Sequence, residues 1–274
     1  MQRFEGELEH LWNLAEIPPI NRLTWDWWWW LIMLEDENHP NRSKQLMVLW
    51  STKETEVIDV SGREWKGGRP NLDPEGGLSI PGMVAAWWFD GQKMREPIVK
   101  KSLRIAAIPS SHTMWPDDEG VPGSGAIVPI DKRDLSMGLT KSADSFWLNL
   151  EPDQEFDDEQ CPKNFSFKMT PWTKPMSTAR WASKKYSMGM GYNILRLHGA
   201  LVEGTVGSEK VSGTAYFQKV CVQAPSPPWY WGMLHTSDGS YIDWFVPHIS
   251  PTMTAKDARP WKMRDIEHLP LSHS

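Results

Sequence analysis

Residues 24–34 read TWDWWWWLIML and contain the longest apolar run of the chain, Trp27 to Leu34. The run is apolar on both alternating faces, which is typical of a β-strand buried on both sides. Because side chains alternate along a strand, Asp26 shares one face with Trp28 and Trp30, and Trp27 and Trp29 lie on the other. We expect one of these sets to line a cavity and the other to pack against a second layer.

The strand pattern continues over most of the chain. Asp90-Gly91 and Asp238-Gly239 are strong hairpin turn signals. The pattern predicts further strands over residues 44–51, 56–60, 82–89, 98–107, 145–150, 164–169, 191–206, 211–223, 229–235 and 241–246. Apolar residues at helical spacing over Phe4–Glu16, followed by Pro18 and Pro19, predict one short N-terminal helix. Many short strands with frequent turns indicate an all-β barrel or sandwich.

A weak internal repeat divides the chain. Three Trp-rich segments, around residues 27–30, 87–88 and 229–231, each precede an acidic turn. The acidic, turn-rich stretch over residues 150–163 separates two strands. We therefore expect two related β domains, residues 1–150 with the leading helix and residues 151–274.

Composition narrows the classes of function. The chain has 274 residues, with 29 Lys and Arg against 35 Asp and Glu, and a net charge of −6, which argues against nucleic acid or an anionic membrane as partner. A bilayer-spanning helix needs ~20 apolar residues, so no transmembrane segment is expected. The first residues lack the apolar core of a signal peptide, and Cys161 and Cys221 lie far apart, so we expect a cytoplasmic protein with reduced thiols.

Common catalytic motifs are missing. The sequence contains no phosphate-binding loop, no dinucleotide-binding glycine motif and no zinc-protease motif. The eight His residues are dispersed without metal-ligand spacing. We expect neither a metal nor a cofactor, and the oligomeric state stays open.

The last predicted hairpin carries one group of candidate site residues. Tyr241 and Asp243 share a strand face, and a carboxyl group among aromatic rings holds its proton more tightly than in water and can serve as a general acid. The alternative is that Asp243 pairs with an Arg or with a backbone amide. The expected catalytic residues are Asp243, Tyr241 and Asp26. The expected ligand contacts are Trp28, Trp30, Trp229, Trp231, His235 and Tyr216.

Three segments carry a family resemblance. They are GALVEG at 199–204, VSGTAYFQ at 211–218, and WYWG at 229–232 with the following Asp238-Gly239. Together with the Trp-rich strand before Glu35-Asp36, they resemble the lipocalin-like family of carotenoid 1,2-hydratases and AttH proteins. The resemblance covers residues 22–60 and 190–247. It implies two lipocalin-like antiparallel β-barrel halves with a ligand site within or between them.

One departure bears on the activity. The family's hydratases carry a His and a Trp on the strand matching Gly213–Gln223, whereas this chain reads Tyr216-Phe-Gln-Lys219-Val-Cys221. The family's Tyr-x-Asp pair corresponds to Tyr241-Ile-Asp243. The departure favours a reaction other than carotenoid hydration, or none.

Three functions are therefore open. The first is a cofactor-independent enzyme of hydro-lyase, isomerase or cyclase type that acts on an isoprenoid- or polyene-like small molecule by acid catalysis and orientation, with Trp faces stabilising positive charge. The second is a non-catalytic carrier of such a hydrophobic ligand. The third is a subunit whose Trp faces form a protein interface.

Overall fold

The structure is a computed structural model of the chain. It describes residues 24–40, 42–53, 58–60, 63–65, 68, 71–72, 78–95, 97–108, 124–127, 135–140, 144–153, 160–172, 180–224 and 229–247. The chain divides into two compact units, Met1–Gln223 and Ala224–Ser274. The predicted helix over Phe4–Glu16 lies outside the described residues.

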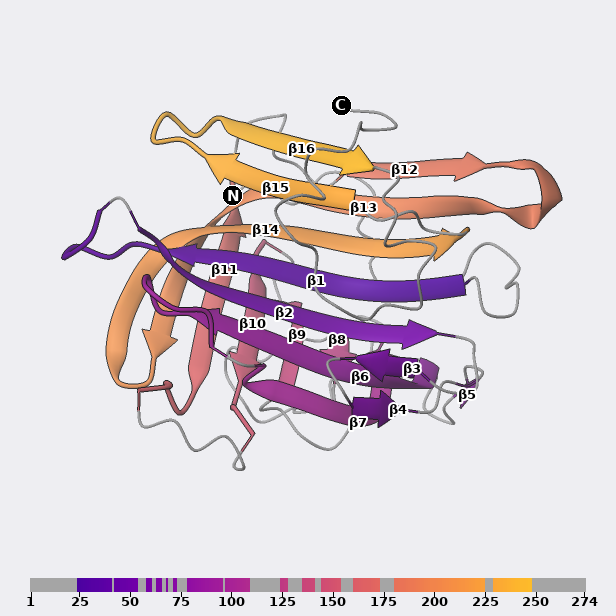
Figure 1. The fold of residues 1–274 in the computed structure, drawn as a ribbon, viewed down its shortest axis with the longest axis horizontal. Coiled ribbons are helices and arrows are strands. Elements are labelled where there is room, and N and C mark those ends of the chain that lie inside the picture. The colour runs from indigo at the N-terminus through magenta and orange to yellow at the C-terminus, as the bar shows by residue number, and fades with distance from the viewer. Residues whose placement is uncertain are drawn as a thin grey trace, which may run out of the picture. The chain divides into compact units, whose positions relative to one another are not determined.

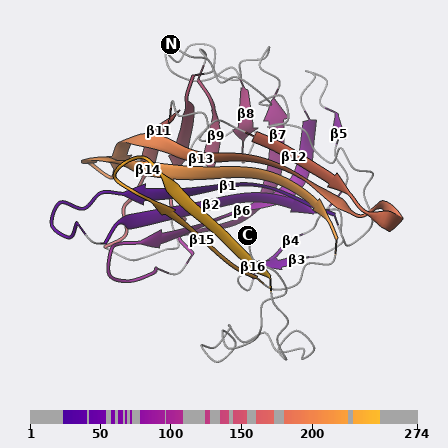
Figure 2. The same ribbon diagram turned by 90° about the horizontal axis from the view of Figure 1, so that it is seen from above.

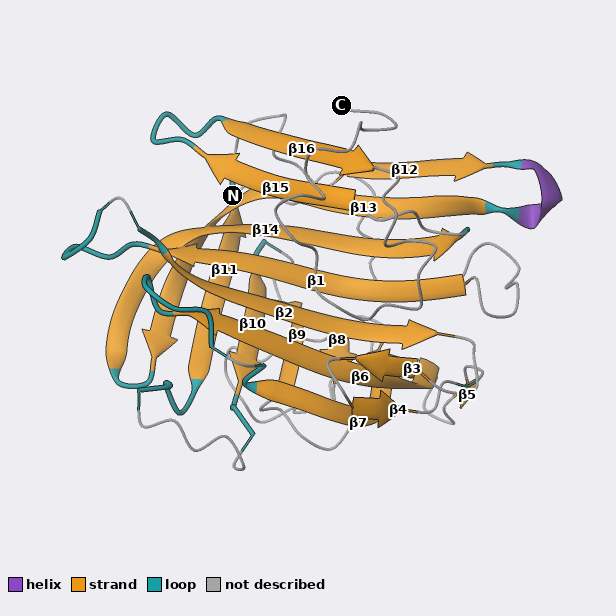
Figure 3. Ribbon diagram, viewed as in Figure 1, coloured by secondary structure: helices purple, strands orange, loops and turns teal. Residues whose placement is uncertain are grey.

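The described part of the first unit is built from antiparallel strands (Figures 1 and 3). They are β1 (Thr24–Leu34), β2 (Lys44–Lys53), β3 (Ile58–Val60), β4 (Arg63–Trp65), β5 (Asn71–Leu72), β6 (Leu78–Phe89), β7 (Val99–Ile108), β8 (Ser124–Ile127), β9 (Leu135–Leu139), β10 (Phe146–Leu150), β11 (Phe165–Pro171), β12 (Arg180–Lys185), β13 (Gly191–Val206) and β14 (Glu209–Gln223). The one helical element among the described residues is a 3-10 turn, Ser187–Gly189, between β12 and β13.

The main sheet has 12 strands and closes on itself. Its order is β11-β10-β9-β8-β7-β6-β2-β1-β14-β13-β12, with β5 beside β6, and β11 also pairs with β13. In Figure 1, β8 to β11 cross behind the long strands β1, β2, β6 and β14, and in Figure 2 they lie in the upper part of the view. Because β12 pairs with the first half of β13 and β11 with its second half, β13 joins the two ends of the strand path. The result is an all-β, barrel-like antiparallel sheet.

The second half of β13 pairs with β11, and glycines permit a close approach of the strands there and between β14 and β1. A β-bulge interrupts the β13–β14 register between Leu197 and Ala200. A Cβ atom on Gly204 would lie 2.0 Å from the backbone oxygen of Ser166, and one on Gly213 would lie 2.1 Å from that of Met33. Bulges and glycines of this kind let a sheet curve into a barrel.

The Asp90-Gly91 turn follows β6 as the sequence predicts. Gly91 adopts a φ of 95°, which an L side chain rarely tolerates. The Asp90 carboxylate accepts hydrogen bonds from the backbone N–H groups of Gln92 and Lys93 and from the Arg95 guanidinium. Desolvation raises the pKa of Asp90, but these hydrogen bonds and the charge of Arg95 outweigh it and lower the pKa below its ordinary value.

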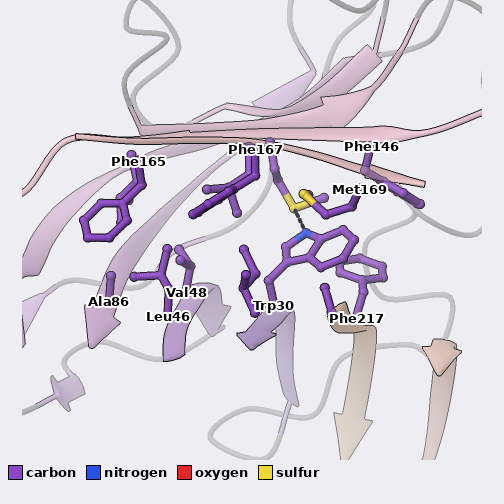
Figure 4. Packing of buried hydrophobic residues seen from close by; sticks show 14 of the residues in the cluster. Trp30, Leu46, Val48, Ala86, Phe146, Phe165, Phe167, Met169 and Phe217 are labelled. Atoms are coloured by element: carbon purple, nitrogen blue, oxygen red, sulfur yellow. Dashed lines mark hydrogen bonds between the residues drawn. The ribbon is translucent and has the colours of Figure 1, made fainter. Parts of the chain in front are cut away.

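Burial along β1 alternates with the side-chain direction. The even-numbered residues from Thr24 to Leu34 are buried, and Trp25, Trp27 and Trp29 are partly buried. The buried set faces the barrel interior. There it joins aromatic and aliphatic side chains from the strands around it, including Trp30, Leu46, Val48, Ala86, Phe146, Phe165, Phe167, Met169 and Phe217 (Figure 4). The expectation that Asp26 shares a face with Trp28 and Trp30 is confirmed.

The described part of the second unit is a hairpin of β15 (Trp229–His235) and β16 (Tyr241–Pro247). Thr236–Ser240 form its turn, in which Gly239 has a φ of 76°. Gly232 lies opposite Trp244, whose ring occupies the space that a Cβ on Gly232 would need. Both strands follow the bounds that alternation and the Asp-Gly turn predict, to within one residue.

The all-β class and the barrel-like sheet are confirmed. The predicted division between residues 150 and 151 stays a prediction; strands from either side of it, β10 and β11, are hydrogen-bonded neighbours. Over the ranges that the structure describes, no helix has the length and apolar character needed to cross a membrane.

Candidate functional site at the polar end of the barrel interior

The inward side chains of β13, β14, β1 and β2 lie in cross-strand rows whose polarity changes along the barrel. One row runs Asn193, Cys221, Asp26, Thr52. The next runs Leu195, Lys219, Trp28, Trp50, and the one after it Leu197, Phe217, Trp30, Val48. The interior is therefore polar at the start of β1 and apolar beyond Trp28. We call the first of these regions the polar end.

Two glutamine contacts complete the polar end. Thr24 Oγ1 donates a hydrogen bond to Gln223 Oε1 at 2.5 Å. Gln223 Nε2 donates to the carbonyl oxygen of Gly189 at 2.6 Å. Gln223 thus ties the start of β1 to the 3-10 turn that precedes β13.

A buried ion pair lies at the boundary between the polar and apolar rows. Lys219 Nζ donates to Asp26 Oδ1 at 2.8 Å, and the two side chains are 1% and 6% exposed. The Lys219 nitrogen also lies 5.6 Å from the centroid of the Trp28 ring. The ammonium group is therefore held between a carboxylate and an aromatic face, both of which stabilise a cation.

The ion pair is not explained by stability alone. Removing two charges from water costs several kcal/mol per ion, and an apolar pair of similar volume is often as stable or more so. The next row of the barrel has such an apolar pair at the equivalent positions, where Phe217 lies opposite Trp30. Charged groups kept in a barrel interior are therefore candidates for binding or chemistry.

Beyond Trp28 the interior is a packed core. Trp30 Nε1 donates to Met137 Sδ at 3.2 Å, the bond drawn in Figure 4. Its ring lies 4.7 Å from that of Phe217 and 5.2 Å from that of Phe146, centroid to centroid. Trp50 Nε1 donates to the carbonyl oxygen of Leu135 at 2.9 Å. Trp28 and Trp30 are both fully buried, and of the two only Trp28 adjoins the ion pair.

Tyr216 lies on the opposite face of the sheet from Asp26. Its neighbour Phe217 points into the barrel, so alternation places Tyr216 outside it. There its ring lies 6.2 Å from that of Trp29 and 6.1 Å from that of His198. Its hydroxyl donates to Gln218 Oε1 at 3.2 Å. The structure therefore does not bring Tyr216 to the same face as Trp28 and Trp30.

The remaining predicted residues lie on the hairpin of the second unit. His235 lies opposite Tyr241, and Asp243 lies opposite Met233, on the same face. Trp231 shares this face and lies opposite Phe245, and Trp229 lies opposite Pro247 in the register. The hairpin thus gathers Trp231, His235, Tyr241 and Asp243 on one face.

Lys219 is the site residue that the sequence reasoning missed. The signal that could have found it is the alternation of its own strand, which puts Lys219 on the same face as Ala215, Phe217 and Cys221, all of them buried. Tyr216 and Val220, on the other face, are buried as well. A lysine in step with three buried residues predicts a buried ammonium group, which needs an anionic partner. Asp26, the acid on the buried face of β1, supplies that partner.

No known protein family matches the chain. No curated protein matches it either. Among solved structures, the chain is similar to the crystal structure of a candidate AttH protein from Nitrosomonas europaea, at 13% identity and a TM-score of 0.46. The match covers 82% of this chain and 61% of that protein.

Proposed function

We propose that the barrel binds a hydrophobic, isoprenoid- or polyene-like small molecule at its polar end and transforms it. The observation that carries the proposal is the Asp26–Lys219 pair, buried at 2.8 Å beside the Trp28 ring. Binding sites for apolar molecules combine aromatic walls with a few polar groups that fix orientation. At the boundary of the polar end, the Trp28 ring supplies an aromatic face and the Asp26–Lys219 pair supplies polar groups.

The proposed chemistry uses the charge of the pair. The Asp26 carboxylate and the Trp28 face would stabilise positive charge that develops on the ligand during hydration, cyclisation or isomerisation. Lys219 positions the carboxylate and supplies a hydrogen-bond donor. A ligand held in one orientation against fixed groups gains rate from alignment alone.

Asp243 and Tyr241 remain a separate proposal as proton donors. They share a face of the β15–β16 hairpin with His235 and Trp231, which is a setting in which a carboxyl group can act as a general acid. The substitution Asp243→Asn tests this role. If turnover is lost and ligand binding is kept, the role is supported; if turnover is kept, Asp243 is not the acid.

The remaining proposals concern the setting of this activity. We propose with it that the chain divides into two lipocalin-like halves with a short N-terminal helix. We also propose that the protein is cytoplasmic and that its activity needs no cofactor. Limited proteolysis tests the division, because two halves predict a cleavage between residues 150 and 164 that leaves stable fragments.

The proposed function is tested by recovering the ligand. The protein is purified from its own host, extracted with organic solvent, and the extract is analysed by mass spectrometry beside that of Asp26→Asn. We expect an apolar molecule in the wild-type extract, and its turnover by the wild type but not by the variant. A ligand bound but not converted would identify a carrier. Stable co-purification of another protein without any apolar molecule would identify an interaction subunit, and would overturn the proposal.

A further inference from the structure

One cross-strand row on the outer face of the sheet carries two arginines. The register pairs Arg180 of β12 with Arg196 of β13, Arg196 with Gln218 of β14, and Gln218 with Trp29 of β1. Strand alternation puts Gln218 on the opposite face from its chain neighbour Lys219, which points into the barrel. The row is therefore separate from the polar end of the interior.

The two arginines lie side by side without an acid between them. Residues directly opposite each other in an antiparallel pair share a face, and like charges at such positions repel each other. Arginine keeps its charge over the whole pH range in which proteins fold. Of the described strand positions that adjoin the pair on this face, none is acidic; they are Ala182, Ile194, His198, Tyr216, Gln218 and Val220.

Arg196 has a hydrogen-bond donor that the protein does not use. The side chain as a whole is partly exposed, but its Nε atom is buried and has no hydrogen-bond partner among the residues that the structure describes. Buried donors of this kind are rare in folded proteins, and each calls for an explanation. A planar guanidinium group with unused donors matches the paired oxygens of a carboxylate or phosphate.

Gln218 adds a second donor beside this guanidinium. The Tyr216 hydroxyl donates to Gln218 Oε1 at 3.2 Å, which engages the acceptor end of the amide and leaves the Nε2 end to donate. The Tyr216 ring is in turn held between those of Trp29 and His198, at 6.2 and 6.1 Å between centroids. Tyr216 is thus a positioning residue that orients the Gln218 amide.

We infer that the outer face of β12, β13 and β14 holds an oxyanion-binding site centred on Arg196 and Gln218, with Arg180 as the second cation. Its ligand is an apolar small molecule with a carboxylate or phosphate group. An anion at this place offsets the repulsion between the arginines and takes up their donors. Ile194 and Trp29, both partly exposed, offer apolar surface for the rest of the ligand. The site shares no residue with the Asp26–Lys219 pair, so it does not depend on the proposed function.

Three probes with one naphthalene body and different end groups test the inference. Naphthoate and naphthyl phosphate are anions at neutral pH, and naphthamide is their uncharged counterpart. Equilibrium dialysis measures the affinity of each. We expect wild-type protein to bind at least one of the anions about 10-fold or more tightly than the amide. The anion that binds more tightly identifies the end group as carboxylate or phosphate.

Substitutions in the row should remove this preference. Arg196→Gln and Arg180→Gln each delete one charge, and each should weaken anion binding by about 10-fold. Arg196→Gln should leave the urea unfolding midpoint unchanged, because the Nε atom has no described partner to lose. Gln218→Glu places a carboxylate beside Arg196 and serves if an arginine variant does not fold. Arg42→Gln is the matched control, since it makes the same change at an exposed residue between β1 and β2.

The pattern across probes and variants decides the outcome. An anion preference that Arg196→Gln, Arg180→Gln and Gln218→Glu remove and Arg42→Gln keeps would support the site. Equal affinities for the three probes, or binding of none of them, would overturn it. A preference that Arg196→Gln leaves intact, or that Arg42→Gln removes as well, would also overturn it, because the anion would then bind elsewhere or respond to net charge alone.

Discussion

Replacing Lys219 with methionine should destabilise the protein strongly. Methionine keeps most of the side-chain volume but leaves the Asp26 carboxylate, 6% exposed, without its partner at 2.8 Å. Breaking a buried ion pair by removing one partner typically costs about 3–5 kcal/mol of unfolding free energy. The loss of the contact with the Trp28 ring adds about 0.5–2 kcal/mol to that cost.

The matched control is the double substitution Asp26→Leu with Lys219→Met. It removes both charges together and continues the apolar rows that begin at Trp28 and Trp30. Replacing a buried pair with apolar residues of similar volume is often neutral or stabilising. We therefore expect the double variant to recover most of the unfolding free energy that Lys219→Met loses.

Urea unfolding followed by far-ultraviolet circular dichroism measures these differences across wild type, Lys219→Met, Asp26→Leu and the double variant. The four unfolding free energies form a double-mutant cycle that isolates the interaction of the pair. A cost below about 1 kcal/mol for Lys219→Met would mean that solvent reaches the pair, since exposed pairs contribute that little. A double variant as unstable as the single one would refute the argument that the ion pair is dispensable for folding.

Three further outcomes are expected. Gly213→Ala should cost about 1–3 kcal/mol in urea unfolding, because its Cβ would lie 2.1 Å from the Met33 backbone oxygen; an unchanged midpoint would contradict this packing. Trp30→Ala should cost about 3–5 kcal/mol in the same assay through the cavity it leaves in the core. A carboxyl NMR titration should place the pKa of Asp90 below its ordinary value of 3.8, and nearer to it in Arg95→Gln. Because the folded pKa is the lower one, the stability contributed by Asp90 is present above pH ~4 and is lost as the pH falls through the folded pKa.

The local part of the fold could be predicted from the sequence. β1 spans the predicted residues 24–34, because a continuous apolar run with polar residues after it leaves few other assignments for this segment. The β15–β16 hairpin is similarly determined by Asp238-Gly239 and the alternation on each side of it. Such elements depend on residues near to one another in the chain.

The closure of the sheet could not be predicted in this way. Short strands such as β4, β5, β8 and β9 carry too few residues for a period to show. The pairing of β11 with β13 joins strands separated by β12, and no local pattern distinguishes it from a β11–β12 pairing. The described strands of the first unit form one closed path. The expected division into two barrel halves stays a prediction.

In the candidate site, too, features set by neighbouring residues could be predicted, and a contact between distant residues could not. Alternation correctly places Asp26 on the face of Trp28 and Trp30. Its partner Lys219 lies 193 residues further along the chain, so the ion pair follows only from the β1–β14 register. Tyr216 and Lys219 belong to one strand, yet their odd spacing sends them to opposite faces.

The most direct test of the central claim is native mass spectrometry of wild-type protein from its own host, beside the Asp26→Leu, Lys219→Met double variant. If the polar end holds an apolar ligand, the wild type should carry a small molecule in stoichiometric amount, and the folded double variant should carry much less. Equal loading of both proteins, or a wild type without any bound small molecule, would contradict the account.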